Sequence, residues 1–198
     1  MTDELTPHQK GREIAKFREK FRHEKIHELT KNDFEDFLKA CPKLFATRSG
    51  SRPDARHEDM HGGQITKSTD EFGNKKNNFP ELKKALKVLV DETSPLEERL
   101  DKIFAENNAV WSGRQNHFKA AQFSSILHLV NPDKYAIFNR HVEDVLESQY
   151  NDKWTVEKFK FDSNNWKTYE KANTMLNYMA GERNCSLYEL DQQLGGQS

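Results

Sequence analysis

The stretch Phe118–Val130, which reads FKAAQFSSILHLV, decides the fold of this chain. It is the most apolar segment of the sequence, and a helix with so few polar residues is typically buried. Its apolar members are Phe118, Ala121, Phe123, Ile126, Leu127, Leu129 and Val130. The next residues are Asn131-Pro132-Asp133, and proline cannot continue a helix because it has no amide hydrogen. The sequence therefore predicts a buried central helix that ends before this proline.

Shorter segments with helical spacing of apolar residues lie on both sides of the central helix. They are Asn32–Ala40, Phe79–Asp91, Leu96–Phe104, Val142–Ser148, Tyr169–Ala180 and Leu187–Leu194. Helix-capping signals occur at Thr6-Pro7, at Thr30, at Ser94-Pro95 and at Ser186 with Glu189. We find no internal repeat and no linker, so we expect a mainly α, compact helical single domain over residues 1–198.

One long segment, Thr47–Asn78, lacks this periodicity. It is rich in Gly, Ser, Asn, Asp and basic residues. A loop of this length inside a compact domain is usually functional or disordered. Gly62-Gly63 indicates a tight turn, so a short hairpin at about 47–78 stays open as an alternative to a plain polar loop.

Composition excludes several classes of protein. With 34% hydrophobic, 11% aromatic and 32% charged residues, the chain is expected to fold and to carry a highly charged surface. Cys41 and Cys185 lie far apart and in no metal-binding array, so we expect neither a disulfide framework nor a zinc site. The segment His57–His61 lacks the spacing of a metalloprotease motif, and we expect no metal and no cofactor. Without an apolar run of spanning length, we expect a soluble, cytoplasmic protein and a monomer.

Charge is unevenly distributed although the net charge is −1. Seven basic residues lie between Lys10 and Lys25, and no acidic residue lies between Asn107 and Pro132. This distribution permits a local basic or neutral cleft that binds nucleic acid. For the stretch from Lys10 to Lys25 alone, an ordinary solvated helix face is the favoured interpretation.

Polar residues gather before two predicted helices. Trp111–Lys119 reads WSGRQNHFK and leads into the central helix, and Lys134–Val142 reads KYAIFNRHV and leads into the next one. Helix N-termini present free backbone N–H groups, which favour anions such as phosphate. The two groups of polar residues can converge on one cleft, and we treat that convergence as the main geometric expectation.

The order of a buried helix, a proline loop and a His-Val pair resembles the helix-hairpin-helix DNA glycosylase superfamily. On that pattern Lys119 matches the nucleophilic lysine of the bifunctional members, Asn139 matches the catalytic aspartate, and His141-Val142 matches the pair that follows it. Leu96–Asp101, Ile126–Leu146 and Met179–Asp191 further resemble a divergent branch associated with anti-phage and modification-dependent restriction modules. Two features depart from the superfamily: Gly113–His117 lacks the Gly-hydrophobic-Gly hairpin, and asparagine replaces the carboxylate.

The resemblance implies a DNA N-glycosylase that flips out a modified base and leaves an abasic site. The anti-phage branch suggests a glucosylated hydroxymethylcytosine as the substrate. The implied catalytic residues are Asn139, His141 and Lys119, which would orient a water, act as acid or base, and serve as a nucleophile. The implied DNA-binding residues are Trp111, Arg114, Asn116, His117, Phe118 and Arg140, which supply stacking surfaces and phosphate contacts.

Structural interpretations compete with each of these roles. Asn139 is also suited to be the N-cap of the next helix, and Lys119 to be a surface lysine. His128 is expected to be a satisfied core histidine, and aromatic residues such as Trp111 and Phe118 are more often core than pocket. The alternatives for the whole protein are a non-catalytic reader of modified DNA and a helical protein–protein adaptor.

Overall fold

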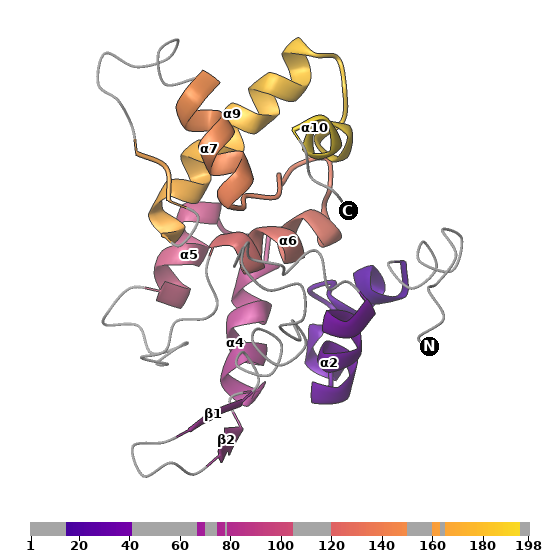
Figure 1. Cartoon of the computed structure of the whole chain (residues 1–198). Coiled ribbons are helices and arrows are strands. Elements are labelled where there is room, and N and C mark those ends of the chain that lie inside the picture. The colour runs from indigo at the N-terminus through magenta and orange to yellow at the C-terminus, as the bar shows by residue number, and fades with distance from the viewer. Residues whose placement is uncertain are drawn as a thin grey trace, which may run out of the picture.

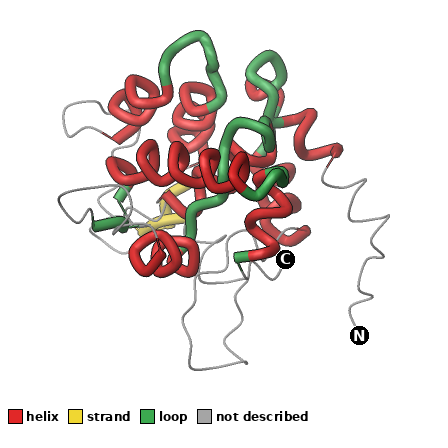
Figure 2. The backbone as a smooth tube through the Cα atoms, turned by 90° about the horizontal axis from the view of Figure 1, so that it is seen from above, coloured by secondary structure: helices red, strands yellow, loops and turns green. Residues whose placement is uncertain are grey.

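The computed structural model describes residues 15–40, 67–69, 75–77, 79–104, 120–149, 160–162 and 165–194. Residues 15–20 are helical and precede the first labelled element. The helices are η1 (Ile26–Glu28), α2 (Lys31–Ala40), α4 (Phe79–Leu89), α5 (Leu96–Phe104), α6 (Ala120–Val130), α7 (Arg140–Gln149), η4 (Trp166–Thr168), α9 (Tyr169–Glu182) and α10 (Leu187–Gln193). The strands are β1 (Lys67–Thr69) and β2 (Lys75–Asn77). Figure 2 shows how small the strands (yellow) are beside the helices (red), so the prediction of a mainly helical fold is confirmed.

The central helix of the fold is α6, as the sequence predicted. Every described side chain from Phe123 to Leu129 is at most 8% exposed, including two serines and His128. In Figure 1, α6 lies between α4 below it and α7, α9 and α10 above it, with α5 to its left. Arg18 reaches α6 from the N-terminal segment, and its Nε donates to the backbone oxygen of Leu129 at 2.8 Å. A cation near the last carbonyl groups stabilises that end of the helix.

Two predicted caps are present with complete hydrogen bonding. At the start of α2, Thr30 Oγ1 accepts from the Asp33 amide at 3.1 Å, and the Asp33 carboxylate accepts from the Thr30 amide at 3.0 Å. Ser186 and Glu189 make the same reciprocal pair before α10, at 3.2 and 2.8 Å. Each capping box satisfies two backbone N–H groups that a helix start leaves without partners. The signal at Thr6-Pro7 lies outside the described residues.

Aromatic side chains join the N-terminal part of the chain to α4. Phe17 packs edge-on against Phe37 with ring centroids 5.2 Å apart, and Phe21 lies 5.0 Å from the same ring. Phe34 then contacts Phe79 on α4 at 6.3 Å. These rings belong to one buried cluster that continues through α6 and α9 to α10. The described helices therefore share a common core.

The strands lie within the segment at about 47–78 for which the sequence left a short hairpin open. They pair antiparallel, with Lys67 opposite Asn77 and Thr69 opposite Lys75. Figure 1 shows the pair at the lower tip of the molecule, beyond the N-terminal end of α4. Gly62 and Gly63 lie outside the described residues. None of the helices in the described part of the chain is long and apolar enough to cross a membrane.

Candidate functional site

The residues between α6 and α7 run back along α6, so that α7 begins near the N-terminal end of α6. Near the last turn of α6, His128 Nδ1 donates to the carbonyl oxygen of Tyr135 at 2.7 Å. Three residues later, the Phe138 amide donates to Ser124 Oγ at 3.0 Å. Ser124 lies about one turn from Ala120, where α6 begins. Asn139 therefore enters α7 beside the first turns of α6, and Figure 1 shows the start of α7 directly above that helix.

Asn139 is the N-cap of α7. Its Oδ1 accepts from the Val142 amide at 3.1 Å, and its backbone oxygen accepts from the Glu143 amide at 2.9 Å. This confirms the capping interpretation. An amide oxygen has two lone pairs, so one cap hydrogen bond leaves Oδ1 able to accept a second.

The other predicted site residues are only partly placed. His141 and Arg140 form the first turn of α7, where their side chains lie outside the described residues. The predicted residues that precede α6 all lie outside the described part as well: Trp111, Arg114, Asn116, His117, Phe118 and Lys119. The structure thus brings Asn139 near the start of α6, and the convergence of the side chains stays a prediction.

Side chains from two helices hold the segment that delivers Asn139. We call Ser124, His128, Tyr169, Asn173 and Asn177 the clasp. Besides the two α6 contacts given above, the Tyr169 hydroxyl donates to the Ala136 oxygen at 2.9 Å, and Asn173 Oδ1 accepts from the Ala136 amide at 2.7 Å. Asn173 and Asn177 each donate to the Lys134 oxygen at 3.2 Å.

The clasp answers a physical requirement of this segment. Tyr135, Ala136 and Phe138 are at most 3% exposed, yet their backbone lies in neither a helix nor a strand. Buried amide and carbonyl groups are costly unless they are hydrogen-bonded, so side chains must supply the missing partners. The clasp consequently fixes the approach to α7, and with it the position of Asn139.

A buried arginine supports the same segment from α5. Arg99 is 2% exposed, and its Nη1 and Nη2 donate to the Leu89 carbonyl and, at 2.7 Å, to the Tyr135 hydroxyl. Its guanidinium lies 5.7 Å from the centre of the Tyr135 ring. Among the described residues no carboxylate lies within ion-pair distance of Arg99, and its buried Nε has no hydrogen-bond partner. The arginine of the Leu96–Asp101 motif therefore anchors Tyr135.

Burial determines the protonation of two clasp residues. Desolvation lowers the pKa of His128 below its ordinary value, although the hydrogen bond to Tyr135 opposes the shift. Since a carbonyl oxygen only accepts, Nδ1 carries the proton of the neutral ring. Desolvation also raises the pKa of Tyr169 well above its ordinary value, which keeps its hydroxyl a donor. Both groups hold the segment as neutral donors.

A small cavity lies beside the start of α7. Its volume is about 10 Å³, and it is lined mainly by Ala136, Ile137, Val142, Leu176, Leu187 and Leu190. A cavity of roughly 10–15 Å³ holds a single water molecule. It is therefore far too small for an everted base, and a base pocket at this end of α6 would need residues outside the described part of the chain.

Sequence reasoning missed most of the clasp and the role of Arg99. Tyr169, Asn173 and Asn177 bind backbone groups 33 to 43 residues away, which no local pattern reveals. The available signal was the pair of asparagines one turn apart on an otherwise amphipathic helix. His128 was expected to be a satisfied core histidine, and the structure confirms this.

In comparisons with protein-family models, with curated proteins and with solved structures, no match to this chain was found.

Proposed function

We propose that the protein is a DNA N-glycosylase that excises a modified base, with its site where α6 and α7 begin. The observation that carries the proposal is the hydrogen bond from the Phe138 amide to Ser124, which lays the start of α7 beside the first turns of α6. Lys119 directly precedes α6, and Asn139 and His141 flank the start of α7. These are the three positions that match the catalytic pattern of the helix-hairpin-helix superfamily.

The reaction requires few groups from the protein. A water molecule attacks C1′ of the sugar, the C1′–N bond breaks, and the base leaves with the bonding electrons and is then protonated. Asn139 can orient the water through the free lone pair of Oδ1, and His141 can act as acid or base near neutral pH. In a lyase variant, Lys119 would attack C1′ in place of water. Arg114 and Arg140 are suited to hold phosphates beside the everted nucleotide.

The first experiment incubates the purified protein with phage DNA that contains glucosylated hydroxymethylcytosine and with unmodified DNA of the same sequence. Abasic sites are counted with an aldehyde-reactive probe. We expect abasic sites in the modified DNA only. If neither DNA acquires abasic sites, the glycosylase proposal is wrong.

Variants connect the activity to the site. Asn139→Ala and His141→Ala should abolish excision or reduce it by about 100-fold or more, the usual range for general acid–base groups. Thr30→Ala is the matched control for Asn139→Ala, because it also removes a helix N-cap but in α2. If Thr30→Ala reduces excision as much as Asn139→Ala does, the loss reflects stability and Asn139 has no role in the reaction.

The second candidate is a non-catalytic reader of modified DNA. The cap of α7 favours it, because Asn139 has no carboxylate and already uses Oδ1 to bind Val142. A reader should bind modified duplex more tightly than unmodified duplex and release no base. Asn139→Ala should then leave most of the binding intact, whereas in an enzyme it should reduce turnover before affinity.

A further inference from the structure

The strands and α4 form the most one-sided charge distribution in the described part of the chain. We call β1, β2 and α4 the basic arm. It carries the lysines Lys67, Lys75, Lys76, Lys83, Lys84 and Lys87. Within the three elements the single acidic residue is Glu81, while Asp70 and Glu71 stand in the sequence between β1 and β2, and the whole chain has a net charge of −1. With six lysines and one glutamate, the residues of β1, β2 and α4 carry a net charge of +5.

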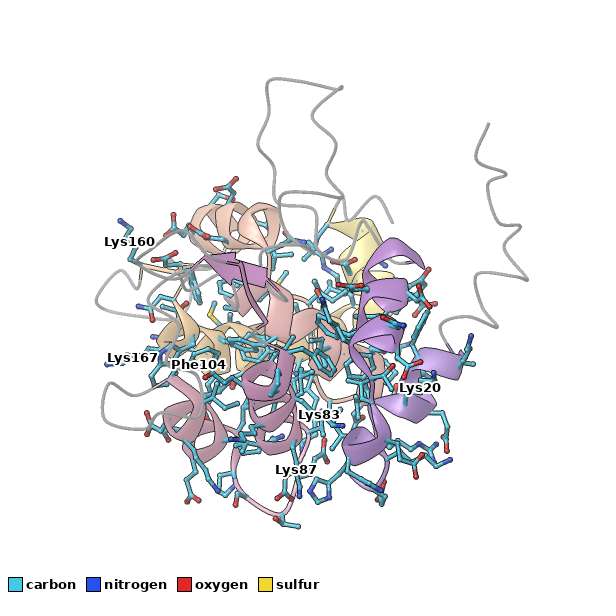
Figure 3. The ribbon with its side chains drawn as sticks, turned by 90° about the horizontal axis from the view of Figure 1, so that it is seen from below. Lys20, Lys83, Lys87, Phe104, Lys160 and Lys167 are labelled. Carbon is cyan, nitrogen blue, oxygen red and sulfur yellow. The ribbon has the colours of Figure 1, made fainter. Side chains whose placement is uncertain are left out.

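Two of the three lysines of α4 are turned to solvent, and among the described residues no carboxylate forms an ion pair with any of the three. Lys84 and Lys87 are exposed, and Lys83 donates its Nζ to the backbone oxygen of His27. Figure 3 shows Lys83 and Lys87 on the face of α4 that is seen from below. Other lysines do have carboxylate partners: Lys20 binds Asp33, Lys25 binds Glu19, and Lys134 binds Glu92. The positive charge of α4 is thus left available to a partner.

The position of the strands supports a role outside the core. The two strands read KST and KKN, so neither contributes an apolar side chain to a core. A two-stranded sheet is marginally stable in isolation. The opposite side of α4 is buried through Leu82, Ala85, Leu86 and Leu89, which directs Lys84 and Lys87 away from the core. On its solvent side α4 therefore exposes charge rather than an apolar surface.

We propose that the basic arm binds the phosphate backbone of duplex DNA. Eleven helical residues and a three-residue strand together extend about 25 Å, which is less than one turn of the duplex, about 34–36 Å. The arm can thus follow one stretch of backbone without wrapping the duplex. Phosphate contacts by lysine release counterions and give affinity without reading sequence. The choice of DNA as the binding partner rests on the proposed function. The inference about the arm specifies which surface of the protein the duplex contacts.

The test measures the affinity of a fluorescent unmodified duplex at several salt concentrations. The arm variant is Lys84→Ala/Lys87→Ala, and alanine preserves helix propensity. The matched control is Lys160→Ala/Arg183→Ala, which removes the same charge from exposed positions outside the basic arm. With the arm variant, we expect the slope of log affinity against log salt to flatten by about 2, and binding near 0.1 M salt to weaken between about tenfold and a hundredfold. The control should retain the wild-type affinity and slope.

Two results would overturn the inference. The first is that the arm variant and the control variant bind the duplex with the same affinity. The second is that duplex binding by the wild-type protein does not depend on salt, which would favour an acidic protein as the partner of the arm. The outcome is separable from that of the glycosylase proposal. If the wild-type protein excises bases and the arm variant binds the duplex normally, the inference about the arm is wrong and the glycosylase proposal stands. If duplex binding depends on the arm but no abasic sites form, the glycosylase proposal is wrong and the inference about the arm stands.

Discussion

Asn139 has a structural role that can be measured apart from any catalysis. Asn139→Ala removes the hydrogen bond to the Val142 amide and should reduce the free energy of unfolding by about 1 kcal/mol. Asn139→Asp retains a capping oxygen and adds a negative charge at the helix start, so it should be neutral or stabilising. Urea unfolding measures both changes. Equal stability of all three proteins would contradict the capping role.

His128 should make stability depend on pH just below neutrality. Its folded pKa is lowered from 6.5 by desolvation, so below pH 6.5 the unfolded chain binds a proton more readily than the folded protein does. The resulting stability is complete above pH 6.5 and is lost as the pH falls, until the folded histidine also titrates. Unfolding midpoints between pH 7.5 and 5 should therefore fall less steeply in His128→Asn, whose amide can still donate to Tyr135. An identical pH slope in both proteins would show that His128 titrates normally.

Local signals at the residue scale were predictable, and tertiary contacts were not. Thr30 and Ser186 were predicted as caps because each partner lies three residues away. Stability of the Tyr135 segment depends on residues more than 30 positions away in α5 and α9, such as Arg99 and Asn173. At Asn139 the sequence supports two interpretations at once, because the same residue fits a helix N-cap and a catalytic position. Sequence alone leaves those two roles open.

At the scale of elements, the clasp should protect the segment before α7. Asn173 satisfies the Ala136 amide and shares the Lys134 oxygen with Asn177. Asn173→Ala leaves a buried amide without a partner and should cost about 1–3 kcal/mol, whereas Asn177→Ala should cost less because Asn173 still binds Lys134. Chemical denaturation gives both values. Hydrogen exchange at the Ala136 amide adds a local readout, and it should accelerate strongly only in Asn173→Ala.

The distribution of charge among elements also differs from the sequence-based expectation. The stretch from Lys10 to Lys25 attracted attention because its basic residues lie close together in the sequence, yet Lys20 and Lys25 pair with Asp33 and Glu19. The interpretation as a solvated helix face holds for residues 15–20, whereas Arg22 and Lys25 lie in a turn and Lys10 and Arg12 lie outside the described residues. The basic arm was not singled out, because its lysines are divided between a segment expected to be a polar loop and a helix with an ordinary apolar stripe. Only the pairing of β1 with β2 ahead of α4 places those lysines in one unit.

At the scale of the whole molecule, the shared core predicts a single cooperative unfolding transition. Buried residues from Phe17 to Leu194 belong to one cluster, which joins the N-terminal aromatic rings to α10 through α4, α6 and α9. Phe21→Ala and Leu190→Ala remove fully buried side chains from opposite ends of this cluster. We expect losses of about 3–5 kcal/mol for the first and about 2–5 kcal/mol for the second, each lowering the midpoint of the same transition.

Near-ultraviolet circular dichroism reports the aromatic packing, and far-ultraviolet circular dichroism reports the helices. In the wild type and in both variants the two signals should change together, since a common core must be lost as a unit. Tyr188→Ala is the control on α10, because that side chain is 56% exposed and its removal should leave the midpoint nearly unchanged. If Phe21→Ala instead separates the unfolding curve into two steps, the N-terminal segment folds independently and the prediction of a single domain is wrong. The phenylalanine contacts that link Phe34 to Phe79 would then stabilise an interface between two units.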